Sequence, residues 1–554
     1  MKAYRKSLLE ALHALEAAGI PEGQIVAVSV FTTQSTTSLL ERIRDQIKAT
    51  DAAPADFQLG TGGRRTTFPL DQIASLRWDQ QLRSDSPTLS PVNVPLSWLR
   101  NIPGAVASVA FGRFVSSNFE TPDAIIPPVP TRTGEPAVQR FEDVFFNLYL
   151  PSGEKPAGGW SVAIFGHGSG SSKQGGPLGG ASMAMAAALA EQGIASIAIN
   201  AVGHGFGPRG MLTVTTAGGE RVTFPAGGRG TDLNGDGVIG NIEGMRTIGA
   251  NAIVDTRDGF RQTAADLMQL VRVIEAGMDA DGDGTFDLDP RCIYYIGQSF
   301  GGNYGSDFLA VEPNVRAGVL LVTGGSLPDV SRLTPAARPR IGALLAARVP
   351  SLQNSIGITE LEGVTTGGAR FNQNIPQRND VALTVRLSNG SEDRIVSPVT
   401  NTVAGAMAIQ EVLDRMEWVQ QSGNCVAYAP HLRKAPLAGV PAKSVLYQFD
   451  KGDQTSPNSA ESAFLRAGDL ADRATFYRND LAYAEDPSIP KDPHTFPTRI
   501  DSTSALMRTI AQGSQEQIAT FLASDGVVII RPEPARFFEV PIVGPLPDAL
   551  DFIR

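Results

Sequence analysis

The sequence predicts an α/β fold, with a mostly parallel central sheet that helices cover on both faces. Short, almost wholly apolar segments recur along the chain, among them 160–165, 195–200 and 292–296. Strands of this composition are those buried on both faces of a sheet. Segments with helical periodicity alternate with them, and such alternation is typical of a parallel sheet.

Composition and charge argue against two kinds of partner. Of the 554 residues, 42% are hydrophobic and 19% are charged, which is typical of a soluble globular protein. The formal net charge is −10 and no basic cluster occurs, so we expect no nucleic-acid partner. No apolar run approaches the roughly 20 residues that a transmembrane helix needs, so we expect no transmembrane segment.

The elements expected from periodicity follow one another along the chain. Near the N-terminus these are a helix at 1–19, a strand at 24–31 and a helix at 36–48, before an irregular stretch at 51–135 with a short strand at 105–111. Later strands are expected at 141–150, 160–165, 195–200, 292–296, 317–323, 444–449 and 474–477, and a hairpin at 211–224. Later helices are expected at 181–192, 263–275, 303–311, 460–470 and 502–521.

The strand–helix alternation divides the chain into four parts. They are an N-terminal extension wrapped on the core (1–137), a first part of the core (138–325, with an insertion at 208–250), a largely helical cap insertion (326–425), and a second part of the core with the C-terminal tail (426–554). We expect the cap, helped by the 208–250 insertion, to cover a substrate pocket.

The best candidate for a catalytic residue is Ser299. The strand at 292–296 runs directly into Gly297-Gln298-Ser299-Phe300-Gly301, and a helical segment follows. A G-x-S-x-G sequence between a strand and a helix holds its serine on a sharp, strained turn, where the hydroxyl is exposed for attack. Glycines on either side leave room for the strand and the helix to approach each other. We therefore predict that Ser299 is a nucleophile.

A nucleophilic serine needs a base to take its proton and an acid to orient that base. This serine turn resembles that of the α/β-hydrolases, and the resemblance implies the chain order serine, acid, histidine. Of the five histidines only His494 lies beyond a plausible acid. Asp453, in a loop directly after the strand at 444–449, is the preferred acid, and Asp450 is its competitor nearer the strand.

The oxyanion formed during attack needs backbone N–H donors held in place beforehand. One is expected at Phe300, directly after the nucleophile. The second is expected at Gly168 or Ser169, in the loop after the strand at 160–165. His167 is then expected to shape this loop, and His204 to be a loop histidine near the mouth of the site.

Two Asp- and Gly-rich loops predict one or two structural calcium sites. The first, 232–243, matches the twelve-residue EF-hand loop in its spacing of oxygen ligands, its glycine and its final glutamate. Its expected ligands are Asp232, Asn234, Asp236, the carbonyl of Val238, and Glu243. An unoccupied acidic turn is the alternative.

The second loop begins at Asp279 and has the same first half as the first. Its expected ligands are Asp279, Asp281, Asp283 and Thr285, with Asp287 or Asp289 in place of the glutamate because Pro290 occupies that position. The loop precedes the strand that leads to Ser299, so a metal here would brace the serine turn. Such loops suit millimolar extracellular calcium. No organic cofactor is expected.

Two cysteines, Cys292 and Cys425, are too few for a disulfide framework. They are expected to be buried thiols, or a single bridge if the protein is extracellular.

Taken together, these residues resemble the α/β-hydrolase superfamily, and more narrowly the large bacterial extracellular lipases and esterases related to virulence-factor lipases. Four segments carry the resemblance: Phe31–Ser35, Asp289–Gly305, Gly452–Asn458 and Asp492–Phe496. The resemblance implies carboxylic ester hydrolysis, the triad given above, and a secreted or cell-envelope location in a bacterium. The first residues do not fit a signal peptide, since no continuous apolar core precedes a cleavage site. We expect either a trimmed N-terminus or a member that differs from the group in this respect.

The sequence thus predicts a serine carboxylic-ester hydrolase that works through an acyl-enzyme. Its substrate is expected to be a small-molecule, lipid or polyester ester. An amidase or acyltransferase with the same triad is one alternative, and a non-catalytic, calcium-stabilised surface protein is another.

Overall fold

The computed structural model describes residues 2–554 except 31–33, 131–132, 176–181, 246–250, 252, 355, 374–380 and 397–401. By their internal contacts these residues form two units, 1–36 and 37–554. The first unit contains α1 (Lys2–Ala17) and the short 3-10 helix η1 (Glu22–Gln24). The predicted helix at 1–19 is confirmed. The predicted strand at 24–31 is wrong for residues 24–30, where no neighbouring strand pairs with the backbone.

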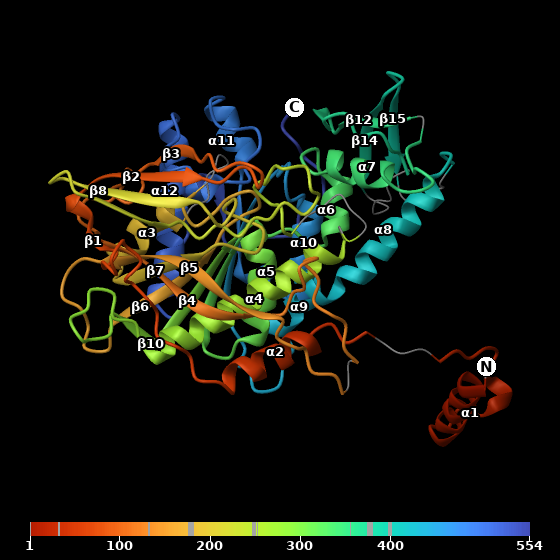
Figure 1. Cartoon of the computed structure of the whole chain (residues 1–554). Helices are drawn as coiled ribbons and strands as arrows, with labels where there is room; N and C mark the ends of the chain where they lie inside the picture. The colour runs from red at the N-terminus through yellow and green to blue at the C-terminus, as the bar shows by residue number, and fades with distance from the viewer. Residues whose placement is uncertain are drawn as a thin grey trace. The chain divides into compact units, whose positions relative to one another are not determined.

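A ten-stranded mixed sheet forms the centre of the second unit (Figure 1). In spatial order its strands are β1 (Thr67–Pro69), β4 (Val106–Asn118), β5 (Arg140–Pro151), β7 (Ile194–Ile199), β6 (Trp160–Gly166), β10 (Leu288–Gln298), β11 (Val315–Leu321), β16 (Ser444–Asp450), β17 (Ala474–Tyr477) and β18 (Phe538–Glu539). The six strands from β7 to β17 are parallel to one another, and the remaining strands pair antiparallel at the two edges. The predicted, mostly parallel sheet is confirmed.

Helices cover the sheet on both faces because successive side chains of its central strands enter opposite cores. In β6, Val162 and Ile164 pack in a core with α4 (Val254–Ala276) and α5 (Phe300–Val311). The alternate residues Ala163 and Phe165 pack in the opposite core, with α3 (Ser182–Glu191) and α12 (Ala505–Ala523). This explains why the strand lacks polar alternation. The other helices of the core are α2 (Ser38–Lys48), α9 (Cys425–Leu432), α10 (Asn458–Gly468) and α11 (Asn479–Glu485).

Residues 37–137 contribute more strand than the sequence predicted. β4 pairs with β5 along almost its whole length, so part of the expected extension belongs to the main sheet. A second sheet joins β2 (Ile73–Gln80) and β3 (Ser90–Val94) to the hairpin β8 (Met211–Thr216) and β9 (Arg221–Pro225), in the order β3-β2-β8-β9. The hairpin is confirmed, but its partner β2 comes from more than 120 residues earlier. Local periodicity cannot reveal a pairing of such range.

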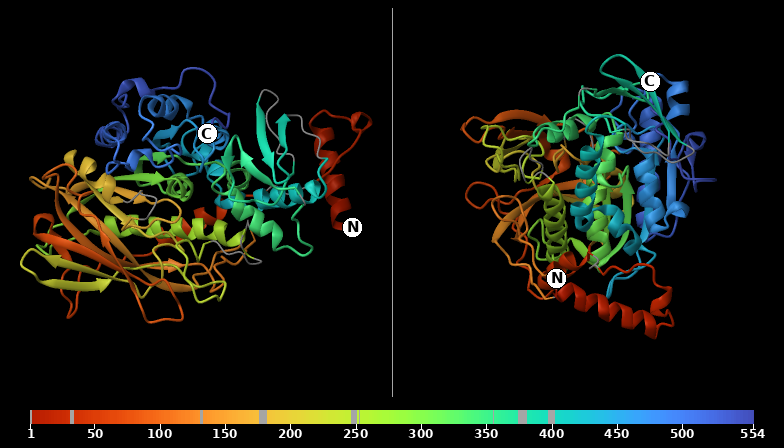
Figure 2. Two further views of the ribbon diagram at one scale, coloured as in Figure 1. Left: turned by 90° about the horizontal axis from the view of Figure 1, so that it is seen from above. Right: turned by 90° about the vertical axis from the view of Figure 1, so that its right-hand side faces the viewer.

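The segment 326–425 combines helices with an unpredicted sheet. Its helices are α6 (Leu327–Leu333), α7 (Arg338–Ala346) and α8 (Ala406–Gln420). Between α7 and α8 lies a four-stranded antiparallel sheet with the order β13 (Val364–Thr365), β12 (Ile358–Leu361), β14 (Ala382–Leu387) and β15 (Glu392–Val396) (Figure 2). The sequence predicted a largely helical insertion here and did not predict this sheet. β14 alternates between buried and less buried residues, but β12 and β13 are short and β15 buries Ile395 alone, so the strand pattern of the segment is weak outside β14.

No helix within the described part of the chain is both long and apolar enough to cross a membrane.

Candidate active site

The turn between β10 and α5 holds Ser299 in a strained backbone conformation. Its φ is 54° and its ψ is −117°, a region that side chains other than glycine rarely enter. The backbone N–H of Ser299 donates to Leu321 at 2.8 Å, and its carbonyl accepts from Gly302 at 2.8 Å. The turn is thus fastened on both sides of the serine.

Two glycines make this turn possible. A Cβ on Gly297 would overlap the carbonyl oxygen of Gly301. A Cβ on Gly301 would in turn overlap the carbonyl oxygen of Gly166, at the end of β6. Both positions of the G-x-S-x-G pattern that must be glycine are therefore explained by contact between backbones.

Ser299, His494 and Asp453 lie in one hydrogen-bonded series. The Ser299 Oγ is 2.9 Å from the Nε2 of His494, and the Nδ1 of His494 is 2.7 Å from the Oδ2 of Asp453. The Asp453 side chain is fully buried and that of His494 nearly so. The structure thus brings together the three residues predicted as a triad.

The loop after β16 decides between the two candidate acids. The second carboxylate oxygen of Asp453 accepts the backbone N–H groups of Thr455 and Ser456, both at 2.7 Å, which fixes the carboxylate toward His494. The carboxyl of Asp450 is also fully buried, but it has no hydrogen-bond partner among the described residues. Asp453 is therefore the residue that orients His494.

The pKa of His494 reflects two opposing effects. Burial lowers it, but the charge of Asp453 and the hydrogen bond to it raise it more, and Asp492 adds to the increase. The net result is a pKa above 6.5. The site therefore favours the imidazolium that forms when His494 takes a proton.

The three predicted oxyanion donors all lie on the wall around Ser299. Gly168, Ser169 and Phe300 line the same cavity as the serine. Gly168 lies so close that a Cβ on it would be 3.4 Å from the Cβ of Ser299. Phe300 begins α5, so its N–H belongs to the first turn of a helix, where backbone donors point outward.

His167 holds the oxyanion loop in place and has no direct contact with the serine hydroxyl. Its Nε2 accepts the N–H of Ala201 at 3.0 Å, so its proton is on Nδ1, which donates to the carbonyl of Gly168 at 3.0 Å. Burial lowers the pKa of His167 to about 4. With both nitrogens hydrogen-bonded and a lowered pKa, the His167 imidazole fixes the shape of this loop.

His204 lies deeper than expected. The sequence placed it near the mouth of the site, but its side chain is fully buried, and its ring centroid lies 5.1 Å from that of His167. Its Nδ1 is 2.8 Å from the carbonyl oxygen of Val202. The segment that follows β7 places His204 in the interior, beside His167.

A cavity of about 300 Å³ opens above Ser299. The core supplies one wall, and residues 327–340 of the 326–425 segment supply the other. Its lining residues are Gly168, Ser169, Ser171, Gln298, Ser299, Phe300, Asn303, Gly324, Leu327, Val330, Ala336, Ala337, Arg340, Thr455, Ser456, Pro490, Asp492, His494, Thr495 and Arg499. None of the described residues of the 208–250 insertion is among them, so the cover over the cavity comes from α6, α7 and their connection.

The lining includes charged residues that the sequence analysis did not select. Arg340, on α7, and Arg499, after the loop of His494, face the cavity together with Asp492. Arg499 is five residues from His494, a proximity that the sequence could have suggested. Arg340 had no comparable signal, because only tertiary packing brings the segment to the site.

The loop 232–243 closes on itself through its acidic side chains. The carboxylate of Asp232 accepts three backbone N–H groups, and that of Glu243 accepts another three from both ends of the loop. Asn234 donates to Asp236, whose other oxygen accepts the N–H of Val238 at 2.8 Å. The five predicted ligand residues thus belong to one compact loop.

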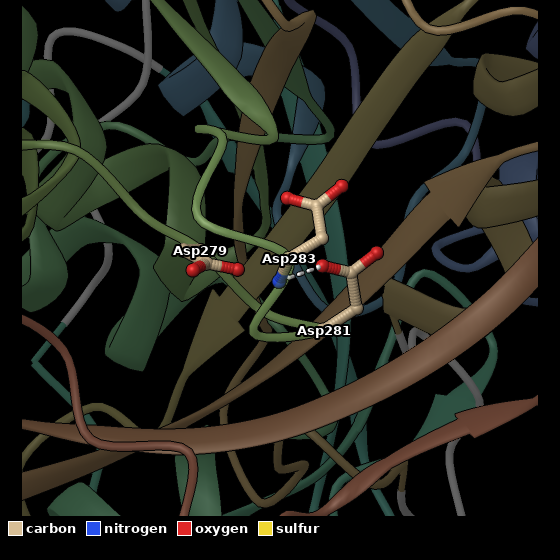
Figure 3. A group of neighbouring side chains, drawn as sticks. All are labelled: Asp279, Asp281 and Asp283. Carbon is tan, nitrogen blue, oxygen red and sulfur yellow. Dashed lines mark hydrogen bonds between the residues drawn. The ribbon is translucent and has the colours of Figure 1, made fainter.

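The second loop gathers three carboxylates more tightly. Within the described residues, the acidic side chains whose ligand atoms all lie within 4.8 Å of one another are Asp279, Asp281 and Asp283 (Figure 3). Thr285 donates to Asp283 through both its N–H and its hydroxyl. This is a donor set of hard oxygens, the kind that calcium prefers.

The structure separates the two candidates for the last ligand of this loop. One oxygen of Asp287 accepts the N–H of Ala280 at 2.7 Å, so its carboxylate lies over the start of the loop, and the other pairs with Lys155 at 2.9 Å. Asp289 instead forms a bidentate pair with Arg291. Asp287 is therefore the better placed of the two.

The cysteines are not bridged. Cys425 is buried and contacts the carbonyl of Gly324 at 3.0 Å, whereas Cys292 is half-buried beside Arg316. The expectation of separate thiols holds, although only Cys425 is fully buried.

Two further carboxyls lie buried behind the triad. Asp450 and Glu461 have fully buried side chains, and burial raises the pKa of both well above the ordinary range. The nearby charge of Asp453 raises each further. Burial thus favours the protonated form of these two carboxyls, whereas the Asp453 carboxylate is hydrogen-bonded to His494.

The Asp450→Asn variant is expected to resist alkaline loss of stability. A carboxyl whose pKa is raised in the folded state stabilises the fold fully only below its unfolded pKa, and this contribution is lost as the pH rises from about 4. Between the unfolded and the folded pKa of such a carboxyl, the free energy of unfolding of the wild type falls by about 1.4 kcal/mol per pH unit. Urea unfolding at pH 5, 7 and 9 measures the difference. Asp123→Asn, an exposed change, should follow the wild type, and a parallel decline for Asp450→Asn would contradict the assignment.

No protein-family model matches the sequence, and no curated protein matches it. Similar solved structures include an acetyl xylan esterase from Paenibacillus sp. R4, with 12% identity over 79% of this chain and 86% of that chain at a TM-score of 0.33. The peroxisomal alpha-beta-hydrolase Lpx1 from Saccharomyces cerevisiae has 10% identity over 77% of this chain and 94% of that chain, at a TM-score of 0.31. The acylaminoacyl peptidase of Pyrococcus horikoshii has 10% identity over 69% of this chain and 39% of that chain, at a TM-score of 0.35.

The architecture of the chain itself identifies its fold. Six parallel strands are covered by helices on both faces, and a strained serine turn joins one of the central strands to its helix. The serine, the acid and the histidine follow in that order along the chain and meet in one hydrogen-bonded series. With this arrangement the chain has the fold of the α/β-hydrolase superfamily.

Proposed function

We propose that the protein is a serine carboxylic-ester hydrolase that works through an acyl-enzyme intermediate. The observation that carries the proposal is the unbroken series from the Ser299 hydroxyl through His494 to Asp453, placed on a strained turn that faces a cavity. A serine hydroxyl is a weak nucleophile until an oriented base removes its proton, and this arrangement supplies such a base.

In the first half of the proposed reaction, the Ser299 Oγ attacks the ester carbonyl carbon while the Nε2 of His494 takes its proton. Asp453 keeps the other ring nitrogen protonated and stabilises the imidazolium. The N–H of Phe300, with that of Gly168 or Ser169, would hold the negative charge on the former carbonyl oxygen. When the C–O bond breaks, the leaving alkoxide takes the proton from His494 and departs as an alcohol.

In the second half, water replaces the alcohol. His494 takes a proton from the water as its oxygen attacks the acyl carbon, and the same backbone donors hold the oxyanion. Collapse of this intermediate breaks the bond to Ser299, whose Oγ takes the proton back from His494. The products are the carboxylic acid and the free enzyme.

Replacement of Ser299 is the direct test. The Ser299→Ala variant is expected to lower kcat on 4-nitrophenyl esters by about 10⁴- to 10⁶-fold, because no other group can form the acyl-enzyme. It should also lose labelling by a fluorophosphonate probe, which reacts with activated serines. Rates and labelling are measured on the same preparations.

A matched control is Ser391→Ala, which removes an exposed serine from the hairpin between β14 and β15 and should behave as the wild type. Labelling of wild-type Ser299 without hydrolysis of any ester would favour the amidase or acyltransferase alternative. Absence of labelling in the folded wild type would favour the non-catalytic alternative.

The pH dependence tests the role of His494. Because only the neutral imidazole can accept the serine proton, kcat/KM should fall at acid pH with a midpoint above 6.5, the direction in which Asp453 moves the pKa. Asp453→Asn should move this midpoint to lower pH and reduce kcat by about 10⁴-fold. An unchanged midpoint in the variant would contradict the pairing.

We also propose that the 279–287 loop, and with it the 232–243 loop, binds Ca²⁺ in a structural role. Hard oxygen donors gathered in the second loop support this proposal, and the loop leads directly into β10, which carries Ser299. Asp279, Asp281 and Asp283 would be its ligands together with Asp287 and the carbonyl of Thr285. Asp287 also pairs with Lys155, but it accepts the N–H of Ala280 within the loop, whereas the carboxylate of Asp289 is bound by Arg291, so Asp289 is left out.

Calcium is expected to raise the temperature of unfolding. At a free concentration 100 times the Kd, one site adds about 2.7 kcal/mol to the free energy of unfolding. Thermal unfolding in 1 mM CaCl₂ and in EDTA measures this effect, and calorimetric titration gives the number of sites. Asp281→Ala and Asp236→Ala should each remove one site, whereas Asp123→Ala should remove none. No heat of binding and no thermal shift would contradict the proposal.

A secreted or cell-envelope location remains part of this proposal. It rests on the calcium loops, since loops of this kind suit the millimolar calcium found outside cells. Immunodetection in separated culture medium, envelope and cytoplasm would test it.

A further inference from the structure

Four groups that can carry charge line the cavity above Ser299 within the described part of the chain. His494 belongs to the triad, and the others are Arg340, Arg499 and Asp492. The two arginines come from different parts of the chain, Arg340 from α7 and Arg499 from the residue that ends the short 3-10 helix η5 (Phe496–Thr498). Two arginines from separate segments therefore line one cavity.

Neither arginine has a carboxylate partner among the described residues. Arg340 is exposed to solvent, and its side chain forms no hydrogen bond or ion pair with any described residue. The guanidinium of Arg499 donates from its Nε to the hydroxyl of Thr495 at 2.7 Å, and no described residue is bonded to its two terminal nitrogens. Arg338 and Arg332, beside this site, are by contrast engaged by carbonyls or carboxylates.

The one acidic side chain of the lining does not neutralise them. The carboxyl of Asp492 accepts the N–H groups of Gln454 and His494 and the hydroxyl of Thr455, at 3.1 to 3.3 Å. These bonds tie it to the two triad loops. No ion pair joins it to Arg340 or Arg499 within the described residues.

The remaining walls are mostly apolar. The apolar residues that line the cavity are Leu327, Val330, Ala336, Ala337 and Pro490, together with Phe300. A ligand that matches this lining has a short apolar body next to the reacting carbonyl and an anionic end. A carboxylate can take two parallel hydrogen bonds from a guanidinium, which gives both affinity and orientation.

We propose that the substrates of this site are esters that carry a free carboxylate, which Arg340 and Arg499 bind while Ser299 attacks the ester carbonyl. The inference rests on the proposed ester hydrolysis and specifies its substrate class. Arg340 and Arg499 would thus be specificity-determining residues that act by binding the substrate.

The test compares esters that differ only in charge. Mono-4-nitrophenyl adipate is matched to 4-nitrophenyl hexanoate and carries the carboxylate on the acyl side. 4-Acetoxybenzoate is matched to methyl 4-acetoxybenzoate and carries it on the alcohol side. The kcat/KM of each ester is measured for the wild type and for Arg340→Gln and Arg499→Gln.

In at least one pair, the wild type should prefer the anionic ester. Each variant should lower kcat/KM for that ester by about 10-fold or more, because a charge-assisted hydrogen bond is lost, and change it for the neutral partner by about twofold or less. The preference should shrink in 0.5 M NaCl, which screens the charges. Arg348→Gln is the control, since Arg348 is an exposed arginine just beyond α7 that does not line the cavity.

The outcomes separate this inference from the proposed function. If the wild type hydrolyses the neutral esters equally well or better, and the variants change both members of each pair alike, the inference is wrong while ester hydrolysis stands. If the wild type hydrolyses none of the four esters, the proposed function fails and the inference fails with it. Circular dichroism of each variant confirms that the fold is retained.

Discussion

The contact between backbones at the serine turn is the constraint on which the rest of the site depends. α5 begins so close to the end of β6 that no side chain fits at Gly301, and the turn is so tight that none fits at Gly297. These contacts hold Ser299 at a positive φ, a conformation that costs on the order of 1–3 kcal/mol. The packing of α5 between the sheet and its neighbours offsets that cost, and it keeps the hydroxyl at the cavity.

The parallel sheet brings the remaining groups to the same place. Ser299 follows β10, Asp453 follows β16 and His494 lies beyond β17, and these strands run in one direction. Loops after parallel strands meet at one edge of the sheet, so residues 195 positions apart can share a hydrogen bond. The loop after β6 arrives at the same edge and lines the same cavity as the histidine.

Hydrogen bonding then distinguishes the acidic groups that lie buried at this edge. Asp453 is buried but accepts two backbone N–H groups and the imidazole, so its charge is compensated. Asp450 accepts no hydrogen bond from the described residues and Glu461 accepts one, from Asn458 at 2.9 Å, and burial raises the pKa of both. Asp453, hydrogen-bonded to the Nδ1 of His494, is the carboxylate that orients the imidazole, and Asp492 adds a further, smaller contribution to the raised pKa of His494.

The sequence by itself determined the parts of this protein that depend on local pattern. Double-sided apolar strands, the glycine spacing around Ser299, the twelve-residue spacing of the first acidic loop and the chain order of serine, acid and histidine are all local or one-dimensional. The sequence preferred Asp453 to Asp450, and the tertiary structure decided between them; it alone decided between Asp287 and Asp289, because both choices depend on which backbone N–H or side chain each carboxylate meets. Long-range pairing likewise decided that β4 joins the main sheet, and packing of the segment 326–425 over the core decided that Arg340 faces the serine.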